Sequence, residues 1–546
     1  MIGVGFAFEL DGEREVRLYR SWDEWYEDFW DLLKASKQNK RLRKIYAHNG
    51  AGFDWLSFIQ WGMKRGLIDD LKYIFAGQGI GVDLHMQRVV IQLRDSYRLL
   101  PASLAKLCET FHTEHRKLDI PTLPHIQLAE NPVLYWQYLQ NDVLSLQEVI
   151  FSFWSSIYNR SGSIGELSMT LPALSAKLWR MTLKVSLATP SNKKLKVMER
   201  RAYTGGRTEC YHSGTAQVSV YDANSEYPSV MIDNIFPVSY SGGFTTGYHG
   251  KHGLYDITYI QHDRTHKPVL RDEETDRFTY VGSGVYAQPE IERLLAMDGE
   301  ITVKEGFVFV DVGNPFHDFI DLYWNTRLDA LARGDEAWAF VCKILMNSLY
   351  GKFGQREDGY TLKLLTADQM IDLLRKKTPI IPAGAFTLVE ESRHSVMTFV
   401  SIAAYITSYA RLWLYDEMAM AQDAGANLYA VDTDSVHFAG DVILPTGKGL
   451  GQWKLEYRGE CTFLGPKLYA QKDGKIKAKG FALRDSGIEY ATYVDLAYGR
   501  IPPLRVTFGV FPTFREVLIQ GKQSAEMLTR TRTMRATTPL RREGNT

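Results

Sequence analysis

The sequence of 546 residues has few cysteines, no net charge and no long apolar run. Its four cysteines are scattered without a Cys-x-x-Cys pair, which argues against a zinc site or a disulfide framework and favours a reducing, intracellular setting. The least charged stretch, residues 396–410, is short for a bilayer span and carries several hydroxyl groups, so we expect a buried helix and no membrane partner. The first residues, Met1 to Gly5, lack the basic start of a secretory signal.

Charge is balanced, with 64 basic and 64 acidic residues, and this balance does not by itself favour a nucleic-acid partner. Charge footprints are local, however, and two stretches are basic, residues 467–479 and residues 530–542. A solvated surface is the alternative interpretation of both stretches. Single hydrophobic cores stop growing at roughly 250–300 residues, so we expect about two to four domains.

The first 165 residues alternate between predicted strands and helices, which is typical of an α/β domain. A hairpin with a turn at Asp11-Gly12 precedes a helix that Ser21 caps, with Glu24 completing a capping box. Further strands are predicted over 44–48 and 89–93, and further helices over 54–65 and 134–152.

The remaining sequence mixes helices and strands in the manner of α+β domains. We predict, in chain order, a strand over 217–222, an irregular β-rich insertion over 240–300, a helical hairpin over 324–349 that bends at Arg333-Gly334-Asp335, a mixed second insertion over 355–393 and a β-hairpin over 428–439.

Three short segments carry the chemical argument. They are residues 221–229, with Asp222 at the end of an apolar strand, residues 343–353, with Lys343, Asn347 and Tyr350 on one helix face, and residues 429–438, with Asp432-Thr433-Asp434 at a hairpin tip. Phosphoryl transfer from a nucleoside triphosphate needs positioning and charge neutralisation more than covalent chemistry. Two magnesium ions, which manganese can replace, take hard oxygen ligands, and two carboxylates on neighbouring strands suffice to hold them.

Each segment alone has a structural explanation. Asp432-Thr433-Asp434 could be ordinary turn chemistry, Gly351 could end a helix as its C-cap, and Asp222 could cap a helix. The three segments together, in this order, make coincidence remote.

The segments resemble motifs A, B and C of family B DNA polymerases. The resemblance implies an RNase H-like exonuclease domain followed by a right-hand polymerase of palm, fingers and thumb. It makes Asp222 and Asp434 the main metal ligands, with Asp432 in support and the Ala223 backbone also reaching a metal. Tyr227 resembles the steric gate that stacks under the deoxyribose and rejects a 2′-hydroxyl.

Other positions follow from the same resemblance. Lys343 and Asn347 would face the incoming nucleotide, and Tyr350 would lie near the nascent base pair. Arg327 resembles a second triphosphate contact, with a helix-surface arginine as the alternative. The family's Lys-x-Tyr motif, which steadies the primer terminus, is matched by Lys467-Leu468-Tyr469.

Tyr203-Thr204-Gly205-Gly206 resembles the Tyr-x-Gly-Gly motif of the protein-primed branch, in which glycines let the backbone approach DNA. The long intervals between motifs A, B and C leave room for the two insertions of that branch. The implied partners are primer-template DNA, deoxynucleoside triphosphates and a terminal protein that supplies the priming hydroxyl; ordinary DNA priming is the alternative. We expect a monomer of phage or linear-plasmid origin, acting in a host cytoplasm or an organelle.

The resemblance extends to an exonuclease module. The residues that match its motifs are Asp54, Asp142, Tyr138 and Lys117 for metal binding and hydrolysis, and His48, Asn49, Phe53 and Ser96 for contacts to a frayed single strand. Turn chemistry is the alternative for His48-Asn49, and a helix-surface acid is the alternative for Asp142. The first motif, Asp-x-Glu on a strand, is not matched, because Asp11-Gly12-Glu13 falls in a hairpin turn. Proofreading is then expected to be weak, through truncation or loss.

Two other functions compete with a polymerase: a catalytically dead DNA-binding scaffold, and a nuclease with a vestigial polymerase half. The intact Asp222, Asp432, Asp434 and Lys343 argue against both. The expected division of the chain is an exonuclease-like domain (1–165), a connector (166–214), palm (215–235), first insertion (236–320), fingers (321–354), second insertion (355–395), palm (396–485), and thumb with basic tail (486–546).

Overall fold

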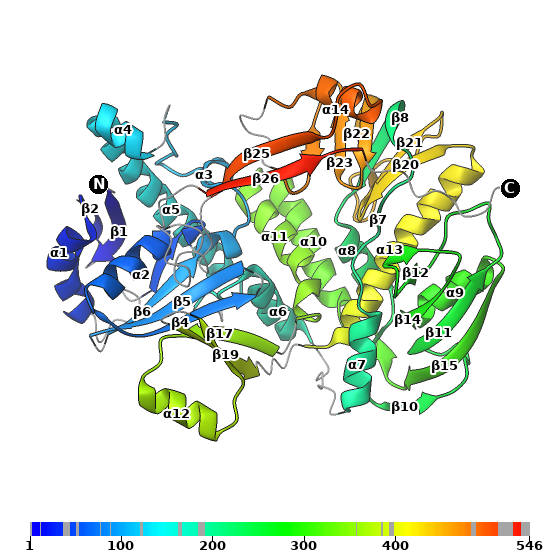
Figure 1. Ribbon diagram of the computed structural model, residues 1–546, viewed down its shortest axis with the longest axis horizontal. Coiled ribbons are helices and arrows are strands. Elements are labelled where there is room, and N and C mark those ends of the chain that lie inside the picture. Colours follow the sequence, from blue (N-terminus) through cyan, green and yellow to red (C-terminus); the bar gives the residue numbers. More distant parts are fainter. Residues whose placement is uncertain are drawn as a thin grey trace.

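The structure is a computed structural model (Figure 1). It describes residues 3–10, 13–35, 44–50, 54–76, 78–87, 89–120, 124–161, 166–183, 192–355, 358–383, 386–392, 398–481, 487–510 and 528–536. An N-terminal unit of helices and strands lies at one end of the molecule in Figure 1, and a second unit built on a large sheet lies at the other end.

The first residues form a hairpin and a helix, as the sequence predicts. Strands β1 (Val4–Leu10) and β2 (Glu13–Tyr19) pair in antiparallel fashion, and α1 (Trp22–Ala35) follows. The Ser21 hydroxyl accepts a hydrogen bond from the Glu24 N–H at 3.2 Å, but the Glu24 carboxylate binds the Arg20 N–H at 2.6 Å, so the capping box is displaced by one residue. The helix buries its aromatic face in the N-terminal core.

The N-terminal unit is built on a seven-stranded sheet with the order β18-β19-β17-β4-β5-β6-β3. Four of its strands come from the N-terminal part of the sequence: β3 (Lys44–Ala47), β4 (Ile68–Ala76), β5 (Gln78–Met86) and β6 (Val89–Asp95). Strands β3 and β6 are parallel, whereas β4, β5 and β6 form an antiparallel meander. The sequence did not predict β4 and β5, because paired aspartates and glycines interrupt their alternation.

Helices surround this sheet. They are α2 (Asp54–Lys64), α3 (Leu104–Thr110), α4 (Pro124–Glu130) and α5 (Pro132–Ser161). The predicted helices over 54–65 and 134–152 are both present, and α5 is longer at each end. Helices α6 (Leu171–Thr182) and α7 (Lys193–Ala202) then lead into the second unit.

The second unit is built on another seven-stranded sheet, with the order β24-β23-β22-β8-β21-β20-β7. Its strands are β7 (Thr208–Cys210), β8 (Gly214–Ala223), β20 (Asn427–Asp432), β21 (Ser435–Ala439), β22 (Trp453–Gly465), β23 (Leu468–Gln471) and β24 (Ile476–Ala478). Helices α8 (Glu226–Asp233) and α13 (Val400–Asp423) pack together beside it. The predicted strand, hairpin and buried helix are thereby confirmed.

The predicted helical hairpin is also confirmed. Helices α10 (His317–Ala332) and α11 (Glu336–Ser348) pack against each other, and Gly334 turns the chain between them with φ +74°. A 3-10 turn over Tyr350–Lys352 follows α11. Gly351 lies inside that turn without a positive φ, so its reading as a helix C-cap is wrong.

The first insertion is a regular antiparallel sheet, which corrects the irregular structure expected from its composition. The strands run in the order β10 (Gly242–Thr245), β15 (Gly299–Phe309), β11 (Gly253–Gln261) and β14 (Val281–Ala287). Helix α9 (Gln288–Ala296) covers it, and short pairs join β9 (Phe236–Pro237) to β16 (Val312–Gly313) and β12 (Arg271–Asp272) to β13 (Arg277–Phe278). Its glycines make room for rings, since a Cβ at Gly306 would lie 2.5 Å from Tyr255.

The second insertion joins the N-terminal sheet. It comprises β17 (Asp358–Lys363), α12 (Ala367–Arg375), β18 (Ile380–Ala383) and β19 (Phe386–Ser392). Strand β17 pairs with β4 through Thr361 and Ile74, so that segments almost 300 residues apart in sequence share one sheet. In Figure 1, α12 projects from the body beyond this sheet.

The last described residues form α14 (Tyr490–Ala497) and a hairpin of β25 (Leu504–Val510) and β26 (Leu528–Met534). Figure 1 shows this hairpin at the top of the molecule, reaching from the second sheet towards the N-terminal unit. Among the residues that the structure describes, every helix is too short or too polar to cross a bilayer.

Candidate functional site

Two of the predicted aspartates lie side by side at the end of the second sheet. Asp222, the last residue but one of β8, lies opposite Ser435 of β21, and the Ala223 N–H donates to the Asp434 carbonyl at 2.8 Å. Thr433 turns the hairpin tip with φ +62°, a left-handed conformation that is rare outside glycine. The strand end and the hairpin tip therefore place Asp222 next to Asp434.

The environment of these two carboxylates disfavours their charge. Burial raises the pKa of Asp222 to about 6, and the neighbouring charge of Asp434 adds to the effect. Burial also raises the pKa of Asp434. Two acids held together against their mutual repulsion form a donor set of hard oxygens that suits a divalent cation.

Asp432 is paired with two lysines. Lys467 forms an ion pair with one carboxylate oxygen, and the Lys477 Nζ lies 3.1 Å from the other. The Thr208 hydroxyl donates to the first oxygen at 3.2 Å. Burial alone would raise the pKa of Asp432, but the two lysines outweigh burial and lower it. This geometry fits a supporting role for Asp432.

Two of these contacts, those of Lys477 and Thr208, were not predicted from the sequence. Lys477 was assigned only to the basic stretch 467–479, and Thr208 was not considered. A signal for Lys477 does exist, because its strand follows the Lys467–Tyr469 strand after a short turn and must pair with it: Tyr469 lies opposite Lys477 in the sheet.

The first and second segments meet through two tyrosines. The rings of Tyr227 and Tyr350 are stacked, with centroids 4.0 Å apart and planes inclined by 19°. The Asn347 amide donates to the Ser225 hydroxyl at 3.2 Å, and Ser225 has φ +58° at the start of α8. Residues that are more than 100 positions apart thus form one wall beside the carboxylates.

Two cations accompany this wall. Lys343 is exposed on α11, and its charge acts on Asp222 and opposes the rise of the pKa of that carboxyl. Arg327 lies beside α11, since its charge acts on the thiol of Cys342. Burial lowers the pKa of Arg327, and its Nε receives no partner from the protein. The alternative interpretation of Arg327 as a helix-surface residue does not explain this buried donor without a partner.

The Tyr-x-Gly-Gly segment lies directly against the hairpin tip. A Cβ on Gly206 would lie 2.7 Å from the Thr433 side chain, so only glycine fits there, whereas Gly205 has open space beside it. The Tyr203 ring packs on Gly354, where a Cβ would come within 2.3 Å. For Gly206, the close approach that glycine permits is to the turn at Thr433.

The Lys-x-Tyr residues lie at a neighbouring turn. Lys467 has φ +56° between β22 and β23, and it points its charge at Asp432. The Tyr469 ring is largely buried, with its centroid 4.8 Å from that of His437. Tyr469 therefore packs into the protein beside the turn at Lys467.

One residue of the site was missed by sequence reasoning. Glu226, beside Tyr227, is only 2% exposed, and neither of its carboxylate oxygens receives a hydrogen bond from the protein. Burial raises its pKa well above the usual value, and the charges of Asp434 and Asp222 add to the effect. An acid in the first turn of a helix ordinarily faces solvent, so no pattern around Glu226 indicates this burial.

The exonuclease-like residues gather in the N-terminal unit. Lys117 lies 2.8 and 3.1 Å from the two oxygens of Asp142 and donates to the Tyr138 hydroxyl at 3.2 Å. Asp54 stands at the start of α2, and desolvation of its carboxyl raises the pKa of that group to about 6. The charges of Asp95 and Asp142 contribute to this shift.

The predicted strand contacts are engaged within the protein. The two ring nitrogens of His48 lie 3.0 Å from the Ser96 hydroxyl and 2.9 Å from the Ala102 carbonyl. Asn49 has φ +62°, and its N–H donates to the buried Asp95 at 2.8 Å. Asp95, which the sequence argument did not consider, thus fixes this turn.

Two sequence predictions fall partly or wholly outside the described residues. Phe53 lies outside them, as do Asp11 and Gly12 of the Asp-Gly-Glu candidate. Glu13 is described, and it is an exposed residue that begins β2.

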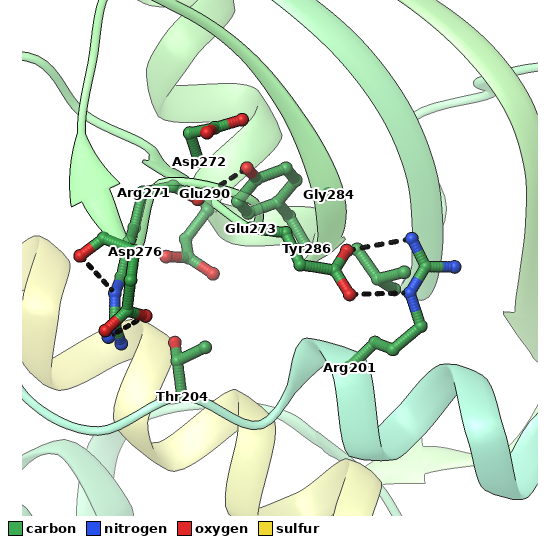
Figure 2. Close-up of a pocket in the computed structure, with 10 residues that line it drawn as sticks. Arg201, Thr204, Arg271, Asp272, Glu273, Asp276, Gly284, Tyr286 and Glu290 are labelled. Atoms are coloured by element: carbon green, nitrogen blue, oxygen red, sulfur yellow. Dashed lines mark hydrogen bonds and ion pairs between the residues drawn. The ribbon is translucent and has the colours of Figure 1, made fainter.

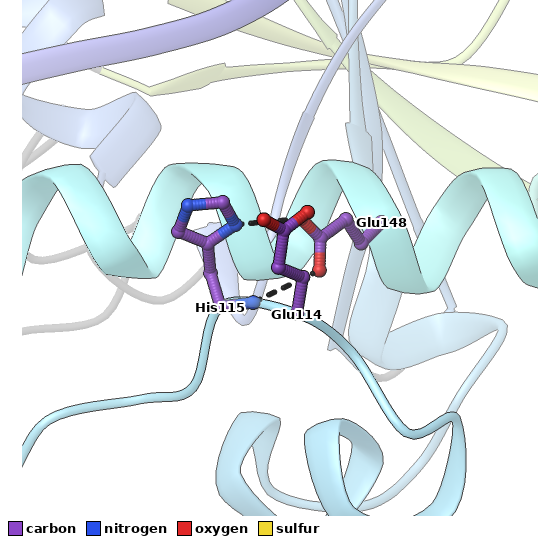
Figure 3. Close-up of side chains that lie close together, drawn as sticks. All are labelled: Glu114, His115 and Glu148. Carbon is purple, nitrogen blue, oxygen red and sulfur yellow. Dashed lines mark hydrogen bonds and ion pairs between the residues drawn. The ribbon is translucent and has the colours of Figure 1, made fainter.

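A separate group of potential metal ligands consists of Glu114, His115 and Glu148, whose ligand atoms lie within 4.8 Å of one another (Figure 3). Glu148 already accepts from Arg14 and from the His115 ring, both at 2.7 Å, and from the His115 N–H at 3.2 Å. These donors lower the pKa of Glu148 against the effect of burial. The group is therefore an ion-pair network that anchors β2 to α5.

The chain is similar to known proteins over most of its length. Residues 35–131 and 133–397 match the family model described as DNA polymerase type B, organellar and viral. A probable DNA polymerase of Neurospora intermedia is 24% identical over 531 residues, which cover 80% of this chain and 53% of that protein. The DNA-directed DNA polymerase of Enterobacteria phage PRD1 is 25% identical over 525 residues, covering 89% and 86%. The chain thus spans about half the length of the fungal relative.

Among solved structures, the Phi29 DNA polymerase complexed with primer-template DNA and incoming nucleotide substrates has the same fold, with a TM-score of 0.69. The match is 18% identical and covers 96% of this chain and 94% of the other. The architecture is therefore a unit with an exonuclease-like fold followed by palm, fingers and thumb. The family match extends over more than half of the sequence, and the chain belongs to the type B DNA polymerases of organelles and viruses.

Proposed function

We propose that this protein is a template-directed DNA polymerase that adds deoxynucleotides to a primer 3′-hydroxyl. The observation that carries the proposal is the pair Asp222 and Asp434, held side by side with raised pKa values beside a cation-bearing helix. The Tyr227–Tyr350 stack completes the site.

The donor set fits two magnesium ions, with manganese as a substitute. Asp222, Asp434 and the backbone at Ala223 would hold them, while Asp432 is occupied by its lysines. When bound, such ions make the primer hydroxyl more acidic and neutralise charge on the phosphates.

The side chains of the chain itself position the reactants. Lys343 provides a mobile point charge for the triphosphate, and Arg327 provides an unused N–H donor. The stacked Tyr227 and Tyr350 give a flat, rigid surface on which a deoxyribose can rest, so a 2′-hydroxyl would collide with it. Lys467 and Lys477 bring positive charge to the turn beside the aspartates, where a primer phosphate can bind.

The proposal is tested by magnesium-dependent extension of a primer on a template with all four deoxynucleotides. Asp434→Asn should abolish extension, because it removes one of two metal-holding carboxylates. Asp441→Asn is the matched control, since Asp441 is an exposed aspartate just beyond the same hairpin, and it should extend normally. Extension by Asp434→Asn at the wild-type rate contradicts the assignment, and an inactive wild type would favour the DNA-binding scaffold.

We also propose protein-primed initiation, on the strength of the Tyr-x-Gly-Gly segment and of the two insertions. A labelled deoxynucleotide should become covalently attached to a terminal protein when that protein and duplex ends are supplied. Extension only from DNA primers would favour ordinary priming. The fungal and phage relatives are consistent with action inside a host cell or organelle.

The N-terminal unit is assigned a residual 3′–5′ exonuclease role in this proposal. Asp54 and Asp142 supply two carboxylates, but Lys117 engages both oxygens of Asp142. Two-metal hydrolysis needs more free carboxylate oxygens than this arrangement offers, so weak degradation is expected.

A further inference from the structure

The first insertion is tied to the palm by a buried ion pair. The Arg411 guanidinium on α13 contacts one oxygen of Glu290 on α9, with Nε at 2.9 Å and Nη2 at 2.8 Å. Both side chains are 4% exposed. Removal of one partner of such a pair leaves a buried charge without compensation, so the pair is sensitive to mutation.

The same arginine holds the Tyr-x-Gly-Gly segment. Its remaining nitrogen, Nη1, donates to the carbonyls of Thr204 and Gly205, each at 2.9 Å. One guanidinium therefore fixes two consecutive peptide groups, and Glu290 fixes the guanidinium. Figure 2 shows Thr204 and Glu290 lining one cavity of about 60 Å³ between α7 and the first insertion.

The next residues transmit this constraint to the catalytic turn. Gly206 is packed on Thr433, with room for no Cβ, and the Thr433 N–H donates to the Arg207 carbonyl at 2.7 Å. Thr433 stands between Asp432 and Asp434 and holds a left-handed conformation. A shift of the 204–207 backbone would therefore shift the hairpin tip.

The first insertion also contacts the residue that follows Gly206. The Arg207 side chain, 1% exposed, donates to the Pro268 carbonyl at 2.8 Å and lies 4.0 Å from the centroid of the Phe278 ring. Both partners belong to the first insertion. Residues 204–207 are thus held at two points, by Arg411 with its partner Glu290 and by the contacts of Arg207 with the first insertion.

We infer that Glu290 is a positioning residue for the Asp432-Thr433-Asp434 turn, acting through Arg411 and the backbone of residues 204–206. The first insertion then stabilises the catalytic geometry, whatever else it binds. This inference rests on the proposed polymerase function. It does not involve direct contact between Glu290 and a substrate.

The test is single-turnover primer extension by Glu290→Gln, with the rate constant taken per active site. We expect that rate constant to fall about tenfold or more, since a misplacement of about 1 Å caused by a mutation far from the chemistry can cost up to about a hundredfold. The dissociation constants for DNA and nucleotide, and the fraction of active enzyme, should stay within about twofold of wild type, because no binding surface changes.

Glu273→Gln is the matched control. Glu273 lines the same cavity and pairs with Arg201 at 2.8 Å, but this pair is exposed and holds no part of the 204–206 backbone (Figure 2). It should leave the rate constant unchanged. A Glu290→Gln enzyme that extends at the wild-type rate, or one that instead loses DNA affinity, would overturn the inference.

Gly206→Ala tests the other end of the path. Its Cβ would press on Thr433, so the rate constant should fall while DNA affinity is kept. If Glu290→Gln does not fold, Gly206→Ala decides, and a normal rate in that variant overturns the inference. Failure of the wild-type chain to extend any primer would instead overturn the proposed function.

Discussion

Glu226 gives the sharpest prediction about stability. Its carboxyl group is buried beneath the candidate site, receives no hydrogen bond from the protein and has a raised pKa. Glu226→Leu removes the acid and fills the space with apolar atoms. Glu226→Gln is the matched control, because it keeps the shape and polarity but cannot ionise.

The sign follows from proton binding in the two states. The folded protein keeps the Glu226 proton at a pH at which the unfolded chain has released it, so folding is favoured at low pH and disfavoured as pH rises. Between the unfolded and the folded pKa, the free energy of unfolding falls by about 1.4 kcal/mol per pH unit. Glu226→Leu also removes a buried unsatisfied polar group, which is worth about 1–3 kcal/mol at any pH.

Thermal unfolding measured from pH 5 to pH 8 in EDTA checks this reasoning. The melting temperature of wild type should fall with pH relative to both variants, by about 2–4 °C for each kcal/mol lost from an unfolding unit of about 150–250 residues. Glu226→Leu should be the more stable variant throughout. If the melting temperatures of wild type and Glu226→Gln depend on pH in the same way from pH 5 to pH 8, the reasoning is refuted. The proton binding of the buried acid would then not differ between the folded and unfolded states in this range.

Three further outcomes are expected. Tyr227→Val should admit ribonucleotides, because it removes half of the stacked wall, and unchanged sugar selection in competition assays would remove the gate role. Lys477→Ala should weaken primer binding and reduce the salt dependence of that binding without altering nucleotide affinity, because the ion pair with Asp432 holds the positive charge of Lys477 beside the turn. A filter-binding titration at several salt concentrations measures this effect. Degradation of single-stranded DNA should be weak and should vanish in Asp142→Ala; robust degradation by wild type would show that further carboxylates act.

The local parts of the site could be predicted from the sequence. Asp222 ends an apolar strand and Asp432-Thr433-Asp434 occupies a tight turn, and both signals depend on a few neighbouring residues. The helix that carries Lys343 likewise follows from its periodicity and from the Gly334 bend. These features are short-range, so pattern and turn chemistry determine them.

The long-range parts could not be predicted. Nothing near Glu226 in the sequence shows that this residue is buried. The pairing of Lys477 with Asp432 depends on a sheet whose strands come from residues 208–223, 427–439 and 453–478. The first insertion seemed irregular because its glycines read as turns, whereas they accommodate rings such as that of Tyr255. Burial and strand pairing across hundreds of residues leave no local signal.

The pairing of β17 with β4 has a consequence for engineering and for aggregation. A variant without residues 358–392 would leave β4 as an open edge, with a row of unsatisfied backbone groups that can recruit another chain. In the intact protein the sheet ends instead at β18, which has four residues and contains Pro382. A short strand with a proline is a poor template for further pairing. The second insertion therefore also protects the N-terminal sheet from pairing with the strand of another chain at this edge.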